Sequence, residues 1–237
     1  MTAPENRQRI ELLDVLRGGA LIVMIAHHIC YDLCAFCGFP WVWFTNPVWN
    51  VVHYLDAGLF ILLAGVSSDF SHSNLRRGAK TLAVALVISV VTYCMKMPIV
   101  FGVLHMMGVC MLLYGLTQSF WQRLPGWVIP ALAAAGTLAT YRLVDGYPTQ
   151  TPHLWMFGLV TKDFSSSDYF PLLPWVFVFL FGTWLGKFIR ERKLPHWFYT
   201  AGCPPLAAIG RHSMLVYVAH QPVIYALVMV GLFLSKR

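Results

Sequence analysis

Charged residues are scarce in this chain: they make up 11% of its 237 residues, whereas 58% are hydrophobic. About a quarter of the residues of an ordinary soluble domain are charged, so this composition argues against a soluble protein. The sequence also lacks a GxSxG elbow, a P-loop, an HExxH pair, paired CxxC motifs and a dinucleotide-binding fingerprint. The function therefore cannot be assigned from any of these motifs.

Two further absences concern the organisation of the chain. The start, MTAPENRQRIELLD, lacks a short apolar core followed by a small-residue cleavage site. We therefore expect the first hydrophobic segment to remain in the mature protein. No internal repeat or low-complexity segment is visible. These observations predict one transmembrane domain over residues 1–237.

Long apolar runs are what the chain has in abundance. Proline, glycine and charge clusters divide them into segments long enough to cross a bilayer. We predict an all-α polytopic membrane bundle with about seven transmembrane helices, and a re-entrant segment near 203–212 would make eight. The predicted spans are 12–34, 48–67, 80–97, 99–119, 126–142, 171–189 and 213–234.

The positive charges predict the orientation. The net charge of +7 comes from short Lys and Arg clusters between apolar runs, which form no groove-sized patch for nucleic acid. Most clusters fall on one side, which we expect to be cytoplasmic, with the N-terminus on that side of the cell (inner) membrane. The long opposite loop, 142–170, is rich in polar, turn and aromatic residues. We expect it to form an ordered cover over a cavity.

The first apolar segment, 9–32, carries ionisable residues, which are costly in a membrane and usually functional. Arg17 and His28 lie about 20° apart around a helix, and Asp14 and Asp32 flank them. At about 1.5 Å per residue, Arg17 lies near the inner surface and His28 lies past the midplane. Asp14 and Arg17 either anchor the helix end or bind phosphate, whereas His28 and Asp32 favour chemistry.

The i, i+4 spacing of His28 and Asp32 predicts that the carboxylate accepts a hydrogen bond from one imidazole nitrogen and aims the other into a cavity. His105 would lie at a similar level in the fourth span, and His220 would lie in the inner half of the last span. These histidines outline a polar path through the bilayer. Further polar groups at span margins are His53, Asp56, Asp168, Arg211 and His212, and Gln221 lies beside His220 inside the last span.

The histidines and cysteines lack the ligand spacings of zinc sites, so we expect no metal. Cys30, Cys34 and Cys37 have the C-x3-C-x2-C spacing of an iron–sulfur motif of radical enzymes. They end a membrane helix, whereas those enzymes are soluble barrels. We therefore interpret the spacing as a coincidence.

Five stretches, read in order, resemble one family: RIELLDVLRGGALIVMIAHH, GLFILLAGVSS, GVLHMMG, DYFPLLPW and GRHSMLVYVAHQPV. The chain resembles, from about Arg9 to Pro222, the bacterial branch of the heparan-alpha-glucosaminide N-acetyltransferase catalytic-domain family, within the transmembrane acyltransferases. The opening R-x4-D-x2-R-G, with a His eleven residues after the second Arg, also resembles the wider membrane acyltransferase-3 class. The matching His there, here His28, is the proposed catalytic residue.

The resemblance implies transfer of an acyl group, usually acetyl from acetyl-CoA, to a sugar or similar acceptor, with donor and acceptor approaching from opposite sides of the membrane. We expect His28, oriented by Asp32, to act as general base or transient acyl carrier, and His105 to stabilise the oxyanion. The expected cofactor-binding residues are Arg17, Arg76, Arg77, Arg211 and His220, with the arginines on the CoA phosphates.

The resemblance also implies that lysosomal members have Asn at the position of His28 and a His near the place of Asn46, so Asn46 or His53 are alternative participants. A transporter or flippase that uses the same polar path is a second hypothesis, and a structural subunit of an envelope assembly is a third. The expected partners are membrane lipid, acyl-CoA and a saccharide or amine acceptor. A homo-oligomer stays open.

Overall fold

A computed structural model describes residues 9–144, 149–151 and 153–235. The chain divides into two compact units: unit 1 comprises residues 1–60 and 194–237, and unit 2 comprises residues 61–193. The division falls inside one helix, α2 (Pro47–Phe70). One domain over residues 1–237 therefore stays a prediction, and each unit is described by itself.

The predicted all-α membrane bundle is confirmed. Among the described residues, six helices are long and apolar enough to cross a membrane, and a shorter apolar helix lies within α5 (Val128–Val144). The six long helices are α1 (Glu11–Cys37), α2, α3 (Asn74–Cys94), α4 (Val103–Arg123), α6 (Leu172–Arg190) and α9 (Ser213–Ser235).

In unit 1, α1 packs against α8 (Pro204–Arg211), α9, and the short helices α7 (His196–Thr200) and η1 (Trp41–Trp43). Two glycines bring α1 and α8 together. A Cβ at Gly18 would overlap the Leu206 carbonyl group, and a Cβ at Gly210 would overlap the Asp14 carbonyl group. Small residues allow such close approach of helices in membranes.

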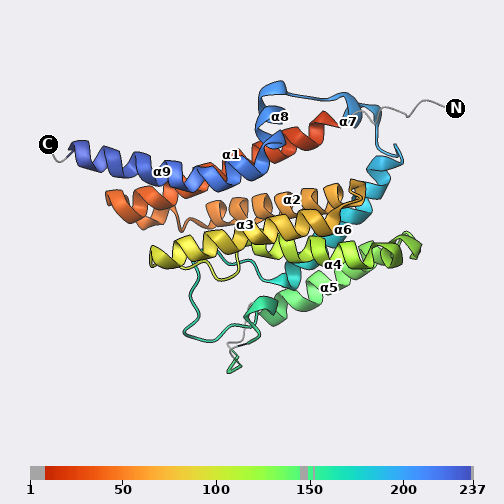
Figure 1. The fold of residues 1–237 in the computed structure, drawn as a ribbon, viewed down its shortest axis with the longest axis horizontal. Coiled ribbons are helices and arrows are strands. Elements are labelled where there is room, and N and C mark those ends of the chain that lie inside the picture. The colour runs from red at the N-terminus through yellow and green to blue at the C-terminus, as the bar shows by residue number, and fades with distance from the viewer. Residues whose placement is uncertain (1–8, 145–148, 152, 236–237) are drawn as a thin grey trace. The chain divides into compact units, whose positions relative to one another are not determined.

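The two long helices α1 and α9 run parallel, side by side (Figure 1). Contacts between them advance together along both chains, from His28 with His220 to Phe36 with Tyr225. The end of α9 therefore lies far from the start of α1. The segment 203–212, predicted to be re-entrant, forms α8, which packs beside the first turns of α1 and precedes α9.

In unit 2, α3 packs along α4, and α6 packs against both α4 and α5 (Figure 1). Glycines again mark the close approaches, since a Cβ at Gly78 would lie 2.9 Å from Leu112. The buried carboxylate of Asp69 near the end of α2 accepts a 3.0 Å hydrogen bond from Arg190 at the end of α6.

The described part of the long loop joins the start of α4. Phe101 and Tyr169 form an isolated parallel β-bridge, and Phe170 donates its N–H to the Phe101 carbonyl at 2.8 Å. Burial raises the pKa of Tyr169 to about 12, so its hydroxyl stays protonated and donates to the carbonyl of Trp155, in η2 (Trp155–Phe157). Residues 145–148 and 152 of the predicted cover lie outside the described residues.

Candidate active site

His28 has a defined tautomer. Its Nδ1 atom lies 2.9 Å from the carbonyl oxygen of Met24, one turn earlier on α1. A carbonyl oxygen can only accept, so Nδ1 carries the proton and the Nε2 atom of the neutral ring carries the lone pair. The first helix therefore presents a base at this position.

The expected hydrogen bond between Asp32 and His28 is wrong. Asp32 is fully buried, and its two oxygens accept from Gln221 Nε2 at 3.0 and 3.1 Å. The physical reason is local: the Met24 carbonyl takes the Nδ1 proton of His28, while the parallel α9 helix brings the Gln221 amide to Asp32. The backbone orients His28, and the carboxylate orients Gln221.

His220 meets His28 in the α1/α9 interface. The two ring centroids lie 4.7 Å apart, edge to face. The expectation that His220 lies nearer the inner surface than His28 is therefore wrong. The reason is α8, which occupies the place beside the first turns of α1, so that α9 begins about level with the middle of α1. His220 Nδ1 donates to the Tyr217 carbonyl, which leaves the lone pair on Nε2.

Two further histidines extend this pair. The rings of His27 and His53 stack at a centroid distance of 4.1 Å, and His27 lies 6.0 Å from His28. His27 also contacts the rings of Phe44 and Trp49, at 4.8 and 5.8 Å. Unit 1 thus contains a histidine cluster, defined here as His27, His28, His53 and His220.

Several buried polar atoms at the cluster lack a hydrogen-bond partner among the described residues. They are His27 Nδ1, Trp49 Nε1, His220 Nε2 and Gln221 Oε1. Most buried polar groups in native proteins are paired, and an unpaired one costs about 1–3 kcal/mol. Such a concentration next to a defined base is typical of a site that binds a polar ligand or water.

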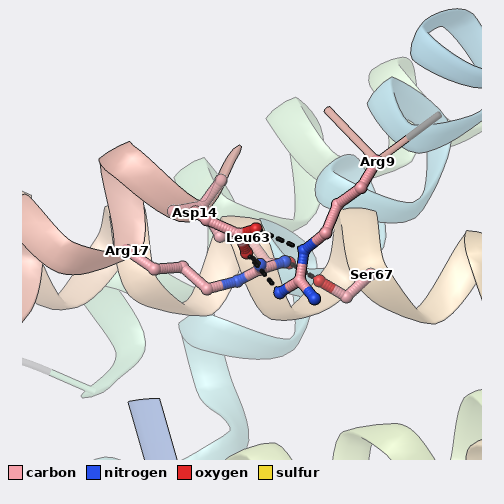
Figure 2. A network of polar contacts seen from close by, with 5 residues as sticks. All are labelled: Arg9, Asp14, Arg17, Leu63 and Ser67. Carbon is pink, nitrogen blue, oxygen red and sulfur yellow. Dashed lines mark hydrogen bonds and ion pairs between the residues drawn. The ribbon is translucent and has the colours of Figure 1, made fainter. Parts of the chain in front are cut away.

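Asp14 binds two arginines near the start of α1, as Figure 2 shows. Arg17 donates to its carboxylate at 2.8 Å, and Arg9 makes the second ion pair. The Asp14 side chain is 3% exposed, whereas those of Arg17 and Arg9 are 19% and 62% exposed. Exposed Arg211 ends α8, directly after Gly210, whose backbone approaches Asp14. This end of unit 1 carries more positive than negative charge.

Three of the predicted site residues, His105, Arg76 and Arg77, belong to unit 2. His105 Nδ1 accepts the Gly102 N–H at 3.2 Å, and its Nε2 lies 3.1 Å from Ser89 Oγ. Because Ser89 donates its own proton to the Ile99 carbonyl, Nε2 of His105 carries the proton. Both nitrogens are thus engaged within the unit. Among the predicted phosphate ligands, Arg76 is exposed and Arg77 donates to the Ser67 carbonyl at 3.0 Å.

Two predicted alternatives acquire defined contacts. Asn46 Oδ1 accepts the Val48 N–H at 2.8 Å, which caps the start of α2 just before Pro47. His53, named as an alternative participant, joins the histidine cluster. Within the described part of the chain, no group of three or more His, Cys, Asp or Glu side chains is arranged to hold a metal ion.

Sequence reasoning missed two residues of the site. Gln221 was noted as a polar residue in the last span, but its pairing with Asp32 depends on helices far apart in the sequence. In the sequence, Trp49 looks like any other aromatic residue of a membrane protein, although its ring stacks on His27 of the histidine cluster and its buried N–H has no partner among the described residues. An amide next to a histidine at membrane depth was the available signal for Gln221, and no local signal marked Trp49.

Comparison with known proteins gives one family. No curated protein and no solved structure matched the chain. The family model described as heparan-alpha-glucosaminide N-acetyltransferase, catalytic, matches residues 9–222, which include all four residues of the histidine cluster. That family consists of membrane acetyltransferases that use acetyl-CoA. The chain belongs to the heparan-alpha-glucosaminide N-acetyltransferase catalytic-domain family.

Proposed function

We propose that this protein transfers an acetyl group from cytoplasmic acetyl-CoA to an amine or hydroxyl of a sugar-type acceptor on the outer side of the cell membrane. The observation that carries the proposal is the tautomer of His28. Its Nδ1 proton is held by the Met24 carbonyl, so Nε2 is a lone-pair base on a helix that is long and apolar enough to cross a membrane. A base in this position is what acyl transfer to a neutral nucleophile needs.

The cations of unit 1 support binding of the donor. Arg9 and Arg17 both bind Asp14, and Arg211 ends the adjacent helix α8, so three arginines and two carboxylates, Asp14 and Glu11, lie at this end of unit 1. Arg17 and His28 are eleven residues apart on α1, or about 16 Å along the helix axis. An extended pantetheine arm covers a length of that order. Arg211, at the end of α8, and Arg76 and Arg77 of unit 2 are further proposed phosphate contacts.

The proton balance of direct transfer is simple. The acceptor nitrogen or oxygen attacks the thioester carbonyl as His28 Nε2 takes its proton, and a tetrahedral oxyanion forms. The carbon–sulfur bond then breaks, and the departing CoA thiolate takes the proton from His28. In the alternative route, Nε2 attacks the thioester carbonyl first and the carbon–sulfur bond breaks, so that the CoA thiolate leaves; the acceptor then takes the acetyl group from Nε2, and the proton that it loses passes to the thiolate.

His105 stays a prediction as the stabiliser of the oxyanion. Its Nε2–H now points to Ser89 Oγ, 3.1 Å away, so it would have to exchange that partner for the oxyanion. Asp32 takes no proton in this scheme. Its carboxylate is bound by Gln221, and His28 is oriented by the backbone.

A second candidate function follows from the length of the histidine cluster. The contacts His53–His27, His27–His28 and His28–His220 form a continuous series, and intramembrane histidines also serve as proton relays in transporters. A transporter or flippase would move a substrate without consuming a thioester. The two functions therefore predict different chemistry from the same residues.

The test uses purified protein in sealed proteoliposomes with acetyl-CoA on one side and glucosamine on the other. Acyl transfer predicts release of the CoA thiol together with acetylated glucosamine, and both depend on His28. Transport predicts flux of intact glucosamine with no thiol release. Glucosamine flux without thioester consumption would refute the proposed reaction.

A further inference from the structure

Asp32 and Gln221 form a carboxylate–amide pair in which the amide group has only one stable orientation. Gln221 Nε2 lies 3.0 and 3.1 Å from the two oxygens of the fully buried Asp32. Only the NH2 group can face a carboxylate, because Oε1 in its place would set one hydrogen-bond acceptor against another. Asp32 therefore fixes Gln221 Oε1 on the other side of the amide.

Two neighbouring atoms, Gln221 Oε1 and His220 Nε2, are both buried, and neither accepts a hydrogen bond from any of the described residues. His220 Nδ1 donates to the Tyr217 carbonyl, so Nε2 of the neutral ring can only accept. Two consecutive residues of α9 thus present buried acceptor atoms and no donor. Buried acceptors of this kind are normally satisfied by a ligand or an ordered water.

The position of these two acceptor atoms indicates which kind of ligand they bind. The His220 ring contacts His28, and Asp32 lies one turn beyond His28 on α1. A molecule held at His28 Nε2 would meet hydrogen-bond acceptors on the α9 side. An amine or a sugar with neighbouring hydroxyl groups supplies several donors to such a site, whereas a carboxylate or phosphate supplies none.

We propose that Gln221 Oε1 and His220 Nε2 bind N–H or O–H donors of the sugar substrate, and that Asp32 is a positioning residue that acts through Gln221. The inference rests on the proposed acyl transfer and adds how the nucleophile is held. One hydrogen of the nucleophile passes to His28 Nε2 as its bond to the acyl carbon forms. A second N–H or O–H group, on the same amine or on a neighbouring hydroxyl, keeps its hydrogen bond to Gln221 Oε1.

The test is a reciprocal exchange of carboxylate and amide, measured with glucosamine and acetyl-CoA. Asp32→Asn removes the charge that fixes the amide, and Gln221→Glu sets two buried carboxylates face to face. Each single variant should raise KM for glucosamine about tenfold, the size of one lost hydrogen bond, and leave KM for acetyl-CoA nearly unchanged. The double variant Asp32→Asn/Gln221→Glu should recover most of the loss, because Asn then donates to one oxygen of Glu and the other oxygen accepts from the sugar.

The control lies in the same interface, one turn further along α1. Phe36 and Tyr225 pack ring to ring at 5.4 Å, so Tyr225→Leu loosens α1 against α9 without touching the amide. It should lower thermal stability and leave KM for glucosamine unchanged. A purely structural role of Asp32 and Gln221 would make their variants behave in the same way.

Three results would overturn the inference: single variants with an unchanged KM for glucosamine, an equal rise of KM for acetyl-CoA, or no recovery in the double variant. If the charge variants do not fold, Gln221→Leu provides the same comparison without a buried charge. If the wild-type protein transfers no acetyl group, the proposed function falls instead. Thermal stabilisation by glucosamine, expected in the wild type and lost in Gln221→Leu, still decides the contact in that case.

Discussion

The rings of His28 and His220 meet at 4.7 Å with their planes at 79°, across two parallel helices from opposite ends of the chain. Each ring donates from Nδ1 to a carbonyl of its own helix, so each neutral ring keeps a lone pair on Nε2. His28 Nε2 is proposed as the base, and His220 Nε2 is proposed to accept from the substrate. Variants at each ring that lose activity but keep their stability distinguish these functions from packing.

Replacing His220 by Phe should separate activity from stability. Phe keeps an aromatic ring against His28 but removes a buried acceptor whose lack of a partner costs about 1–3 kcal/mol. Thermal stability in detergent should be unchanged or higher, while transfer to glucosamine should fall about tenfold. Loss of both together would show that His220 serves the fold alone.

Arg17→Ala and Arg9→Ala should differ, although both arginines bind Asp14. The Arg17 side chain is 19% exposed and that of Arg9 is 62% exposed, so only Arg17 is shielded from solvent screening. Arg17→Ala should raise KM for acetyl-CoA by about tenfold or more, as expected for a bond to a charged group. Arg9→Ala should change it by less than about fivefold. Equal effects of the two variants, measured by initial rates, would contradict a specific phosphate contact at Arg17.

The contact of α1 with α8 should tolerate no side chain at Gly18. A Cβ there would overlap the Leu206 carbonyl group, whereas a Cβ at the adjacent Gly19 meets nothing within 4 Å. Gly18→Val should lower the free energy of unfolding by about 1–3 kcal/mol or prevent assembly of α8. Gly19→Ala should be neutral or stabilise α1 by up to about 1 kcal/mol. Thermal unfolding of both variants in the same detergent measures the difference, and equal stability would refute the close approach.

Asp168 should act as a cap for α4. Its Oδ2 accepts the N–H of Val103, the first residue of that helix, at 3.2 Å. Asp168→Ala should lower stability by about 0.5–2 kcal/mol, the usual cost of losing such a cap. Exposed Asp163 in the same loop is the matched control, and Asp163→Ala should shift stability by less than about 0.5 kcal/mol. If both variants lost a similar amount of stability, the effect would come from the charge of the loop and not from the cap.

The helices of this protein could be predicted from its sequence because apolar length alone decides which segments suit a membrane. The first span, predicted at 12–34, is the helix Glu11–Cys37, and the last, predicted at 213–234, is Ser213–Ser235. His28 also stood out, because an ionisable residue in an apolar helix is costly enough to require a reason.

The partners of these residues could not be predicted, since they are set by how helices dock. The depth of His220 was misjudged because α8 sits beside the first turns of α1 and displaces the start of α9. The i, i+4 spacing of His28 and Asp32 suggested a local pair, but a backbone carbonyl and the Gln221 amide were the stronger available partners. Local spacing cannot rank a neighbour on the same helix against a group on another helix.

The central claim, that His28 Nε2 is the base of acyl transfer, is tested most directly by single-turnover transfer of labelled acetyl from acetyl-CoA to glucosamine by wild-type and His28→Gln protein. Acetyl-CoA binding, measured as an increase in the thermal stability of the protein, serves as the control for intact structure. We expect that His28→Gln protein still binds acetyl-CoA and that its transfer rate falls by about 10² to 10⁴. Transfer at the wild-type rate by folded His28→Gln protein would contradict the claim.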